Sequence, residues 1–412
     1  MTIETGPQSK ISVRGVVPDV CKRNDTTNPG GRVMHTISKR SLILASCAVV
    51  AAAALQLTTT AVLAQSQPAK RIYIVQSYEK GHVCGEPQAE GILGALAAGG
   101  WEVGRNLTVQ SYYMDTYRTN AAPEAMKAEG QKALAEIAEF KPDIVFVLDD
   151  AAVRQVMLPL IGRTDMSVVF SGMNGQPEIY NEPKHYLDSW AHPGGNVTGV
   201  YEKLYAAQSL KVMAQAVPTL RDGKAVMITD GSPTGNGLTK QFELELKDHD
   251  IKWEVRRVKD WGEYTALIKT LNDDATVKAI YPVARTLPVE GGGRYAAAQI
   301  YDWTIANSRK PEMAINYFFA RMGLFGGAVV NFNAMGKLAG QKGAKILGGA
   351  KAGDLPVEDA PDYAIVFNLK RASDLGIEIS PRVLAAASAI YKDNLVPLQG
   401  RPLLYDPQVK SF

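Results

Sequence analysis

The sequence contains little cysteine and, beyond its first 64 residues, no long apolar run. Its three cysteines are Cys21, Cys47 and Cys84. Only Cys84 follows residue 64, so the chain beyond that point cannot form an internal disulfide. No later apolar stretch approaches the roughly 20 residues that a membrane-spanning helix needs. Stability must therefore come from burial of apolar side chains, which a chain of this length can achieve.

A charge bias of either sign is also missing. The chain holds 45 Lys or Arg and 42 Asp or Glu, of which seven and three lie in the first 64 residues. The remainder therefore carries 38 basic and 39 acidic residues. No basic stripe with interleaved aromatics occurs. This composition excludes nucleic acid as a predicted partner.

Catalytic and metal-binding patterns are absent from the sequence as well. There is no Gly-x-Ser-x-Gly elbow, and the histidines lack the spacing of metal ligands. Gly291, Gly292 and Gly293 lack the full glycine pattern and a preceding strand, and we interpret them as a loop rather than a phosphate cradle. The sequence predicts no enzyme activity, no metal site and no cofactor.

An export signal is predicted in the N-terminal region. A basic pair at residues 39–40 precedes an apolar run over 42–55 and a small-residue pattern ending at Ala64. This order of charge, short apolar core and small-residue cut site is typical of a secretory signal peptide. We expect residues 1–64 to be a leader and signal peptide that is cleaved near Ala64; translation starts either at Met1 or, more simply, at Met34. A soluble periplasmic protein is the expected product.

The remaining chain alternates short apolar runs with longer amphipathic segments. The expected strands are 72–75, 107–112, 144–148, 168–170, 225–228, 252–258, 279–281, 313–318, 326–332 and 363–369. The expected helices are 87–99, 122–139, 151–160, 202–216, 236–248, 263–272, 295–307, 334–348, 370–375 and 382–391. Such alternation predicts an α/β fold with parallel sheets wrapped by helices.

Two such series, joined by a glycine-rich segment at 192–200, predict two Rossmann-like lobes. The tail is too short for a third domain but can return to each lobe once, which gives three hinge crossovers. We assign residues 65–199 plus 330–355 to lobe 1, and residues 200–329 plus 356–412 to lobe 2.

Candidate ligand-binding residues follow the strands, because ligands of open parallel sheets bind at the carboxyl ends of the strands. In the first lobe they are Gln76, Ser77, Tyr78, Asp149, Asp150, Ser171, Met173 and Asn174. In the second lobe they are Thr229, Asp230, Tyr281, Arg285 and Tyr317.

Their chemistry suits a small organic ligand. One of Asp149 and Asp150 is expected to cap the helix that follows, while the other can pair a ligand ammonium group. Asn174 either orients a ligand or belongs to a turn. Arg285 either holds a carboxylate through two hydrogen bonds or is a solvated surface arginine. Tyr317 suits an aromatic ligand or core packing equally well.

Several segments also carry a family resemblance: Gly100–Leu107 with the pattern G-x-x-x-G-x-N, Lys141–Val145, Pro193–Val200, Gly353–Val357, and Asn368–Ala372 with Leu375–Ile377. Together they resemble the substrate-binding proteins of ABC importers, in the group that includes tryptophan- and tyrosine-type binding proteins. The resemblance implies a type I periplasmic-binding fold, a ligand between the lobes and an ABC permease of the inner membrane as partner.

The chain departs from that family after the fourth strand. Many members have an Asp-Pro pair there, whereas this chain has Ser171-Gly172-Met173-Asn174. The departure indicates a subgroup with its own specificity, although a hydrophobic or aromatic amino acid is the ligand that the resemblance implies. We expect a monomeric receptor that closes on its solute by a hinge motion and delivers it to the importer. A ligand sensor for a membrane-bound kinase, or an exported enzyme on the same fold, are the alternatives.

Overall fold

The computed structural model describes residues 69–395. The predicted leader, with its cleavage site near Ala64 and its start at Met1 or Met34, lies outside the described residues. Those that are described belong to a single compact unit. In this part of the chain, no helix has both the length and the apolar character that crossing a membrane requires.

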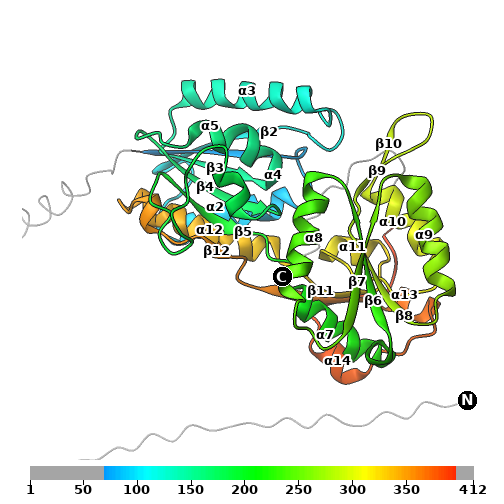
Figure 1. Cartoon of the computed structure of the whole chain (residues 1–412). Helices are drawn as coiled ribbons and strands as arrows, with labels where there is room; N and C mark the ends of the chain where they lie inside the picture. Colours follow the sequence, from blue (N-terminus) through cyan, green and yellow to red (C-terminus); the bar gives the residue numbers. More distant parts are fainter. Residues whose placement is uncertain (1–68, 396–412) are drawn as a thin grey trace, which may run out of the picture. The chain divides into compact units, whose positions relative to one another are not determined.

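The sheet of the first lobe is built from β1 (Lys70–Gln76), β2 (Leu107–Tyr113), β3 (Ile144–Leu148), β4 (Ser167–Met173), β5 (Val197–Tyr201) and β12 (Glu358–Asp359). Their order is β12-β5-β4-β3-β1-β2, and all neighbours pair in parallel (Figure 1). The sequence of β3, Ile-Val-Phe-Val-Leu, is buried throughout. A continuous apolar strand of this kind is typical of a sheet covered on both faces.

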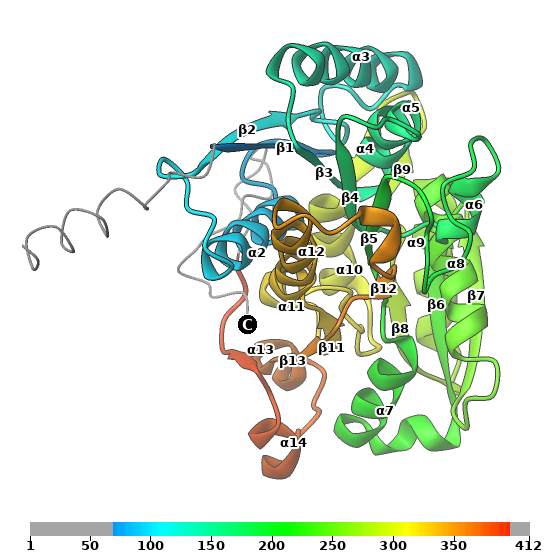
Figure 2. The same ribbon diagram turned by 90° about the vertical axis from the view of Figure 1, so that its left-hand side faces the viewer.

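Helices cover both faces of this sheet. They are α2 (Gly85–Ala98), α3 (Pro123–Phe140), α4 (Asp149–Ala152), the π-helical turn η1 (Val153–Met157), α5 (Leu158–Leu160), α6 (Pro177–Asn181), α12 (Phe332–Leu347) and the short η3 (Ala352–Asp354). Successive residues of a strand point to opposite faces. Ile72 and Ile74 of β1 therefore join the core beneath α2 and α12, whereas Tyr73 and Val75 join the core beneath α3 and η1. Figure 2 shows α2 and α12 on one side of the sheet and α3 and α5 on the other.

The second lobe contains β6 (Lys224–Asp230), β7 (Lys252–Val258), β8 (Val277–Pro282), β11 (Gly326–Val330), β13 (Tyr363–Asn368) and β14 (Ala389–Tyr391). Isolated bridges through residues 312–316 connect β8 with β11 and so link β7-β6-β8 to β11-β13-β14. β11 runs antiparallel to β13, so the expectation of purely parallel sheets is wrong for this pair. The reason is that β11 leads out towards the first lobe, whereas β13 returns from it.

The helices of the second lobe are α7 (Ala206–Ala216), η2 (Pro218–Asp222), α8 (Pro233–Glu245), α9 (Trp261–Asp273), α10 (Ala297–Asn307), α11 (Tyr317–Met322), α13 (Leu369–Asp374) and α14 (Pro381–Ala385). A hairpin of β9 (Thr286–Pro288) and β10 (Arg294–Ala296) is added to them. Residues 291–293, the glycine triplet, form its loop, and all three have positive φ.

Two sequence-based assignments in this lobe are wrong. The segment 313–318 ends as a helix rather than a strand, because the Asn316 side chain accepts a hydrogen bond from Phe319 N and caps α11. The segment 382–391 is not one helix, because α14 stops at Ala385 and residues 389–391 pair with β13 as a strand.

Within residues 69–395 the chain passes between the two sheets three times: after β5, between β11 and α12, and between β12 and β13. This confirms the predicted two-lobed α/β fold with three crossovers. The lobe limits given above stay a prediction. Strand pairing places two segments in the sheet of the first lobe: Tyr201, which ends β5, and residues 358–359, which form β12.

Candidate ligand-binding site

The carboxyl ends of β1, β3 and β4 bring the first-lobe candidates together. Ser77 follows β1 and is completely buried. Its hydroxyl donates to Leu148 O at 2.6 Å and accepts from Ala152 N at 2.9 Å. Both hydrogen-bonding roles of this hydroxyl are thus used to join β1 to β3 and α4. Ser77 orders the site rather than offering a free group to a ligand.

Asp150 has a similar ordering role. Its carboxylate accepts hydrogen bonds from Asn174 N at 3.2 Å, from Gly175 N at 3.1 Å and from the Tyr180 hydroxyl. These bonds fix the loop that follows β4. The expected helix cap is wrong, since no side chain caps the start of α4. The loop after the adjacent strand β4, and not its own helix, supplies the backbone donors that bind Asp150.

Asp149, in contrast, is under-bonded and strained. It has φ of +68°, which is unusual for a residue with a Cβ atom, and its Oδ2 has no hydrogen-bond partner among the described residues. Burial, followed by the charges of Glu202 and Asp150, raises the pKa of Asp149 well above its usual range. A Cβ atom on the neighbouring Gly172 would lie 2.8 Å from the Gln88 amide and 3.0 Å from Asp149 Oδ1. The absence of a side chain at Gly172 therefore lets Gln88 and Asp149 approach one another.

The second lobe meets these residues through Arg285. This side chain is 7% exposed, and it donates from Nη2 to Asn174 Oδ1 at 3.1 Å. A second polar contact between the lobes joins Gln176 Nε2 to Gly237 O at 3.1 Å. Arg285 is therefore not a solvated surface residue. It binds the amide of Asn174 through one hydrogen bond.

Two aromatic rings and a histidine lie beside this charged group. The rings of Tyr78 and Tyr117 stack with centroids 4.6 Å apart, and His82 packs 4.2 Å from the Tyr78 ring. Burial, followed by the Arg285 charge, lowers the pKa of His82 to about 3, so this histidine is neutral. Burial, followed by the charge of Asp149, raises the pKa of Tyr78, while the charge of Arg285 acts in the opposite direction.

Glu202 completes the arrangement from the first crossover. It is 2% exposed, and its Oε1 has no hydrogen-bond partner within residues 69–395. Burial raises its pKa to about 7, while Arg285 and Asn174 act in the opposite direction. We call the group formed by these side chains the inter-lobe site: Tyr78, Gln88, Tyr117, Asp149, Asn174, Glu202 and Arg285.

The remaining predicted residues are buried, but they differ in their pairing. Gln76, Ser171 and Tyr281, at or near the ends of β1, β4 and β8, have side-chain oxygens without a partner among residues 69–395. Thr229 pairs with Thr239 at 3.0 Å, and Asp230 accepts a hydrogen bond from Ser232 N at 2.8 Å. Met173 packs in the apolar core, and Tyr317 begins α11. None of these positions establishes a contact with a ligand, and the roles stay predictions.

Gln88, Tyr117, His82 and Glu202 were not among the sequence candidates. Gln88 lies on a helix, and Tyr117 and His82 lie in long loops, where position alone carries no signal. Glu202 had a usable signal, because it directly follows β5. The same rule that selected residues after the other strands would have included it.

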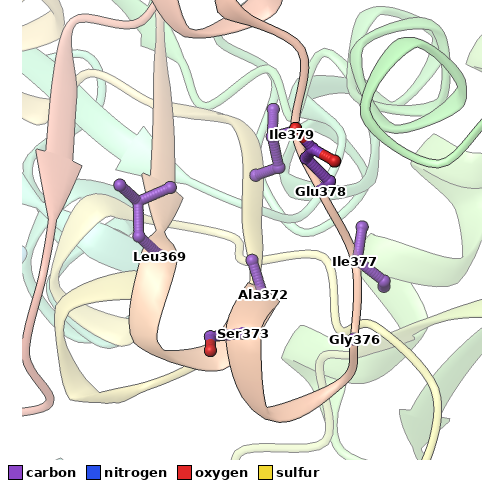
Figure 3. Close-up of a pocket in the computed structure, with 7 residues that line it drawn as sticks. All are labelled: Leu369, Ala372, Ser373, Gly376, Ile377, Glu378 and Ile379. Atoms are coloured by element: carbon purple, nitrogen blue, oxygen red, sulfur yellow. The ribbon is translucent and has the colours of Figure 1, made fainter.

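An open pocket of about 400 Å³ lies elsewhere, at the C-terminal end of α13 (Figure 3). It is lined by Leu369, Ala372, Ser373, Gly376, Ile377, Glu378 and Ile379. None of the predicted site residues contributes to it.

In the described part of the chain, no group of three His, Cys, Asp or Glu side chains is arranged to hold a metal ion.

Comparisons with known proteins agree with this architecture. The sequence model of the family described as ABC transporter substrate binding protein matches residues 183–391. A Streptococcus pneumonia structure described as an ABC domain in complex with L-Trp is 19% identical, with a TM-score of 0.60 over 78% of this chain and 99% of that one. A ligand-free, open substrate-binding protein from Clostridium difficile is 17% identical, with a TM-score of 0.60 over 79% and 100%. A conserved domain protein from Vibrio cholerae is also 17% identical, with a TM-score of 0.59 over 78% and 99%. No curated protein matches.

Proposed function

The chain belongs to the ABC transporter substrate-binding protein family, and on that premise we propose that it is a periplasmic receptor for a small organic solute that an ABC importer takes up. The single observation that carries this proposal is the inter-lobe site. It joins buried, incompletely hydrogen-bonded side chains of both lobes at the carboxyl ends of their strands, where α/β folds bind ligands. Unpaired buried polar atoms cost about 1–3 kcal/mol each, so a bound solute would relieve a real penalty.

The proposed mechanism is hinge closure. Arg285 and Asn174 come from different lobes, so their hydrogen bond exists only while the lobes are close. A solute that touches both lobes binds the closed form more tightly and shifts the population towards it. The membrane permease then recognises the closed form. We expect the receptor to act as a monomer in this cycle.

We propose an amino acid, or a molecule of similar size, as the solute. The L-Trp named for the pneumococcal structure supports this class, as do the Tyr78 and Tyr117 rings beside a set of hydrogen-bonding groups. Aromatic side chains provide flat apolar walls, and a few polar groups then fix the ligand's orientation.

A binding experiment tests the proposal. The protein is stripped of co-purified solute by unfolding and refolding, and the twenty amino acids and related amines and acids are screened by thermal shift. We expect at least one to raise the melting temperature and to reduce the radius of gyration in X-ray scattering. Arg285→Ala removes the hydrogen bond to Asn174 across the lobes and should abolish the change in scattering, whereas Arg294→Ala, at an exposed arginine of the same lobe, should leave it intact. A screen without any stabilising solute, together with unchanged scattering, would contradict the proposal.

Export is tested separately. We expect the mature protein to begin near Gln65 in the periplasmic fraction, which N-terminal sequencing of the purified material can establish. Material that keeps residues 1–64, or that stays in the cytoplasm, would contradict the proposed location.

A further inference from the structure

The buried charges of the inter-lobe site do not balance. Asp149 and Glu202 are 3% and 2% exposed, and each has a carboxylate oxygen without a hydrogen-bond partner among the described residues. Lys342, Arg371 and Arg285 are the buried Lys and Arg side chains of residues 69–395. The first two pair with other carboxylates, which leaves Arg285 to face both acids. The site therefore has more buried carboxylates than it has cations.

Histidine does not supply the missing charge. His82 is buried beside Tyr78, and the Arg285 charge adds to its burial in keeping it neutral. Asp150 is also at this site, but two backbone N–H groups and the Tyr180 hydroxyl already serve it. The surplus therefore rests on Asp149 and Glu202.

Acceptors predominate among the unpartnered atoms of this site in residues 69–395. Gln76 Oε1, Gln88 Oε1, Asp149 Oδ2 and Glu202 Oε1 are acceptors on residues at most 3% exposed, whereas Asn174 Nδ2 is the one atom there, among the described residues, that can only donate. Gln88 and Asp149 meet around Gly172, where a Cβ atom would lie within 3.0 Å of both side chains. A carboxylate or phosphate would add further acceptors to this group. Donors are what these atoms lack.

We propose that the solute bears a cationic nitrogen with several N–H donors, held by Asp149 and Glu202 with the Gln88 amide, and that it carries more positive than negative charge. The proposal rests on the binding function proposed above and names the chemical class of its ligand. A primary amine, an amidinium or a guanidinium group meets the description. The stacked rings of Tyr78 and Tyr117 belong to the same site and provide an apolar wall for the rest of the solute.

Binding of such a cation displaces a proton. In the ligand-free protein the surplus charge is avoided by keeping one carboxyl protonated. The groups that interact electrostatically with Glu202 are Arg285 and Tyr281 from the second lobe, and Asn174, Asp150, Asp149, Tyr201 and Cys84 from the first. When R–NH3+ enters, the neutral carboxyl gives up its proton to solvent and the carboxylate pairs with the ammonium group. Charge is conserved, because one cation enters and one proton leaves.

Two matched sets of small molecules distinguish the effect of the ligand's charge from the effect of its shape. Tyramine, L-tyrosine and 4-hydroxyphenylpropionate share one skeleton as cation, zwitterion and anion, and agmatine and L-arginine form an aliphatic pair. Each is added to stripped full-length protein at pH 7 and followed by thermal shift and calorimetry. We expect tyramine or agmatine to bind and the anion not to bind. Binding of L-tyrosine or the anion in preference to both amines would overturn the inference, and so would no response to either amine.

Amino-acid substitutions test which carboxylates bind the cationic group of the solute. Asp149→Asn and Glu202→Gln keep the side-chain shape, and each should weaken binding of the amine by about tenfold or more. Asp359→Asn removes a half-exposed carboxylate that pairs with Lys203 at the third crossover, and it should leave the affinity unchanged. Equal affinity of all three variants and the wild type would overturn the inference.

Proton release gives a readout that does not depend on how the variants fold. The binding enthalpy of the amine to the wild type is measured at pH 7 in two buffers with different ionisation enthalpies. We expect the difference to show proton release, and the affinity to increase from pH 6 to pH 8. Proton uptake, or no exchange, would overturn the inference. Native mass spectrometry of the solute that co-purifies judges the receptor function independently: a bound acid would contradict the cation and leave the receptor function standing.

Discussion

Two buried charged groups of this molecule differ in how completely they are paired. In the second lobe, Arg371 donates to both oxygens of Glu312, one of them at 3.0 Å, and to Ile305 O and Ser308 O at 2.9 Å each. In the inter-lobe site, Asp149 and Glu202 each keep one oxygen that has no hydrogen-bond partner in the described part of the chain. Complete pairing identifies a group that holds the fold together. A group that is equally buried but incompletely paired does not serve stability, and we attribute ligand binding to it.

Breaking the complete pair should have the largest effect on stability. Arg371→Met leaves the fully buried Glu312 carboxylate without its partner. We expect a loss of about 3–5 kcal/mol in the free energy of unfolding, because an uncompensated buried charge is very unfavourable. Urea denaturation measures the loss. A loss below about 1 kcal/mol would show that Glu312 becomes protonated at little cost, and the contrast between the two groups would then fail.

Replacing Glu202 with glutamine should stabilise the ligand-free protein at high pH, in contrast to the loss of stability expected for Arg371→Met. Burial raises the pKa of Glu202 from 4.5 to about 7, so the folded protein holds a proton that the unfolded chain has lost between these pH values. Its contribution to stability is therefore fully present below pH 4.5 and is lost as the pH rises through 7. Relative to Glu202→Gln, the ligand-free wild type should lose about 3 kcal/mol across that range. Paired urea titrations at pH 4.5 and pH 8 measure the difference.

The comparison with Glu202→Gln is needed because the contribution of His82 to stability changes with pH in the opposite direction. Its lowered pKa means that the unfolded chain binds the extra proton, so its contribution grows as the pH rises. The wild-type profile sums these effects with that of Asp149, whose pKa is also raised, whereas the difference between the two proteins reports Glu202 together with its coupling to Asp149. A difference that does not change with pH would contradict the assignment.

A pair of glycines sharpens the comparison within the first lobe. Gly172 and Gly162 both have φ of +81°, so an alanine at either position costs about 1–2 kcal/mol of backbone strain. No atom lies within 4 Å of a Cβ at Gly162, whereas one at Gly172 would press on Gln88 and Asp149. Gly172→Ala should therefore be the less stable variant and should also lose solute-induced stabilisation in thermal shift. Identical behaviour of the two would show that the space around Gly172 is unimportant.

The smallest effect is expected for an exposed pair on the same helix as Arg371. Lys370 and Asp374 are an i,i+4 pair with largely solvated side chains. Lys370→Ala should change the free energy of unfolding by less than about 1 kcal/mol, because water screens such pairs. A loss similar to that of Arg371→Met in the same urea experiment would mean that burial does not explain the difference between the two residues.

Much of the candidate site was accessible to reasoning from sequence. The rule that ligands bind after parallel strands selected Asp149, Asn174 and Arg285, and the fold brings these three together. It did not reveal their partners. Asp150 serves the loop after β4 instead of its own helix, and Gln88 reaches Asp149 from a helix, because both contacts depend on how distant segments pack.

By itself, the sequence determined the alternation of strands and helices, the two series and the ends of most strands. It could do so because apolar periodicity and turn residues act over a few neighbouring positions. The tertiary structure decided which buried polar groups are satisfied and which are not. Asn174 and Arg285 are 111 positions apart, and only the meeting of two separately formed sheets places one against the other. The surplus of negative charge at that meeting point is a property of the packed molecule, since the charges of the chain as a whole nearly cancel.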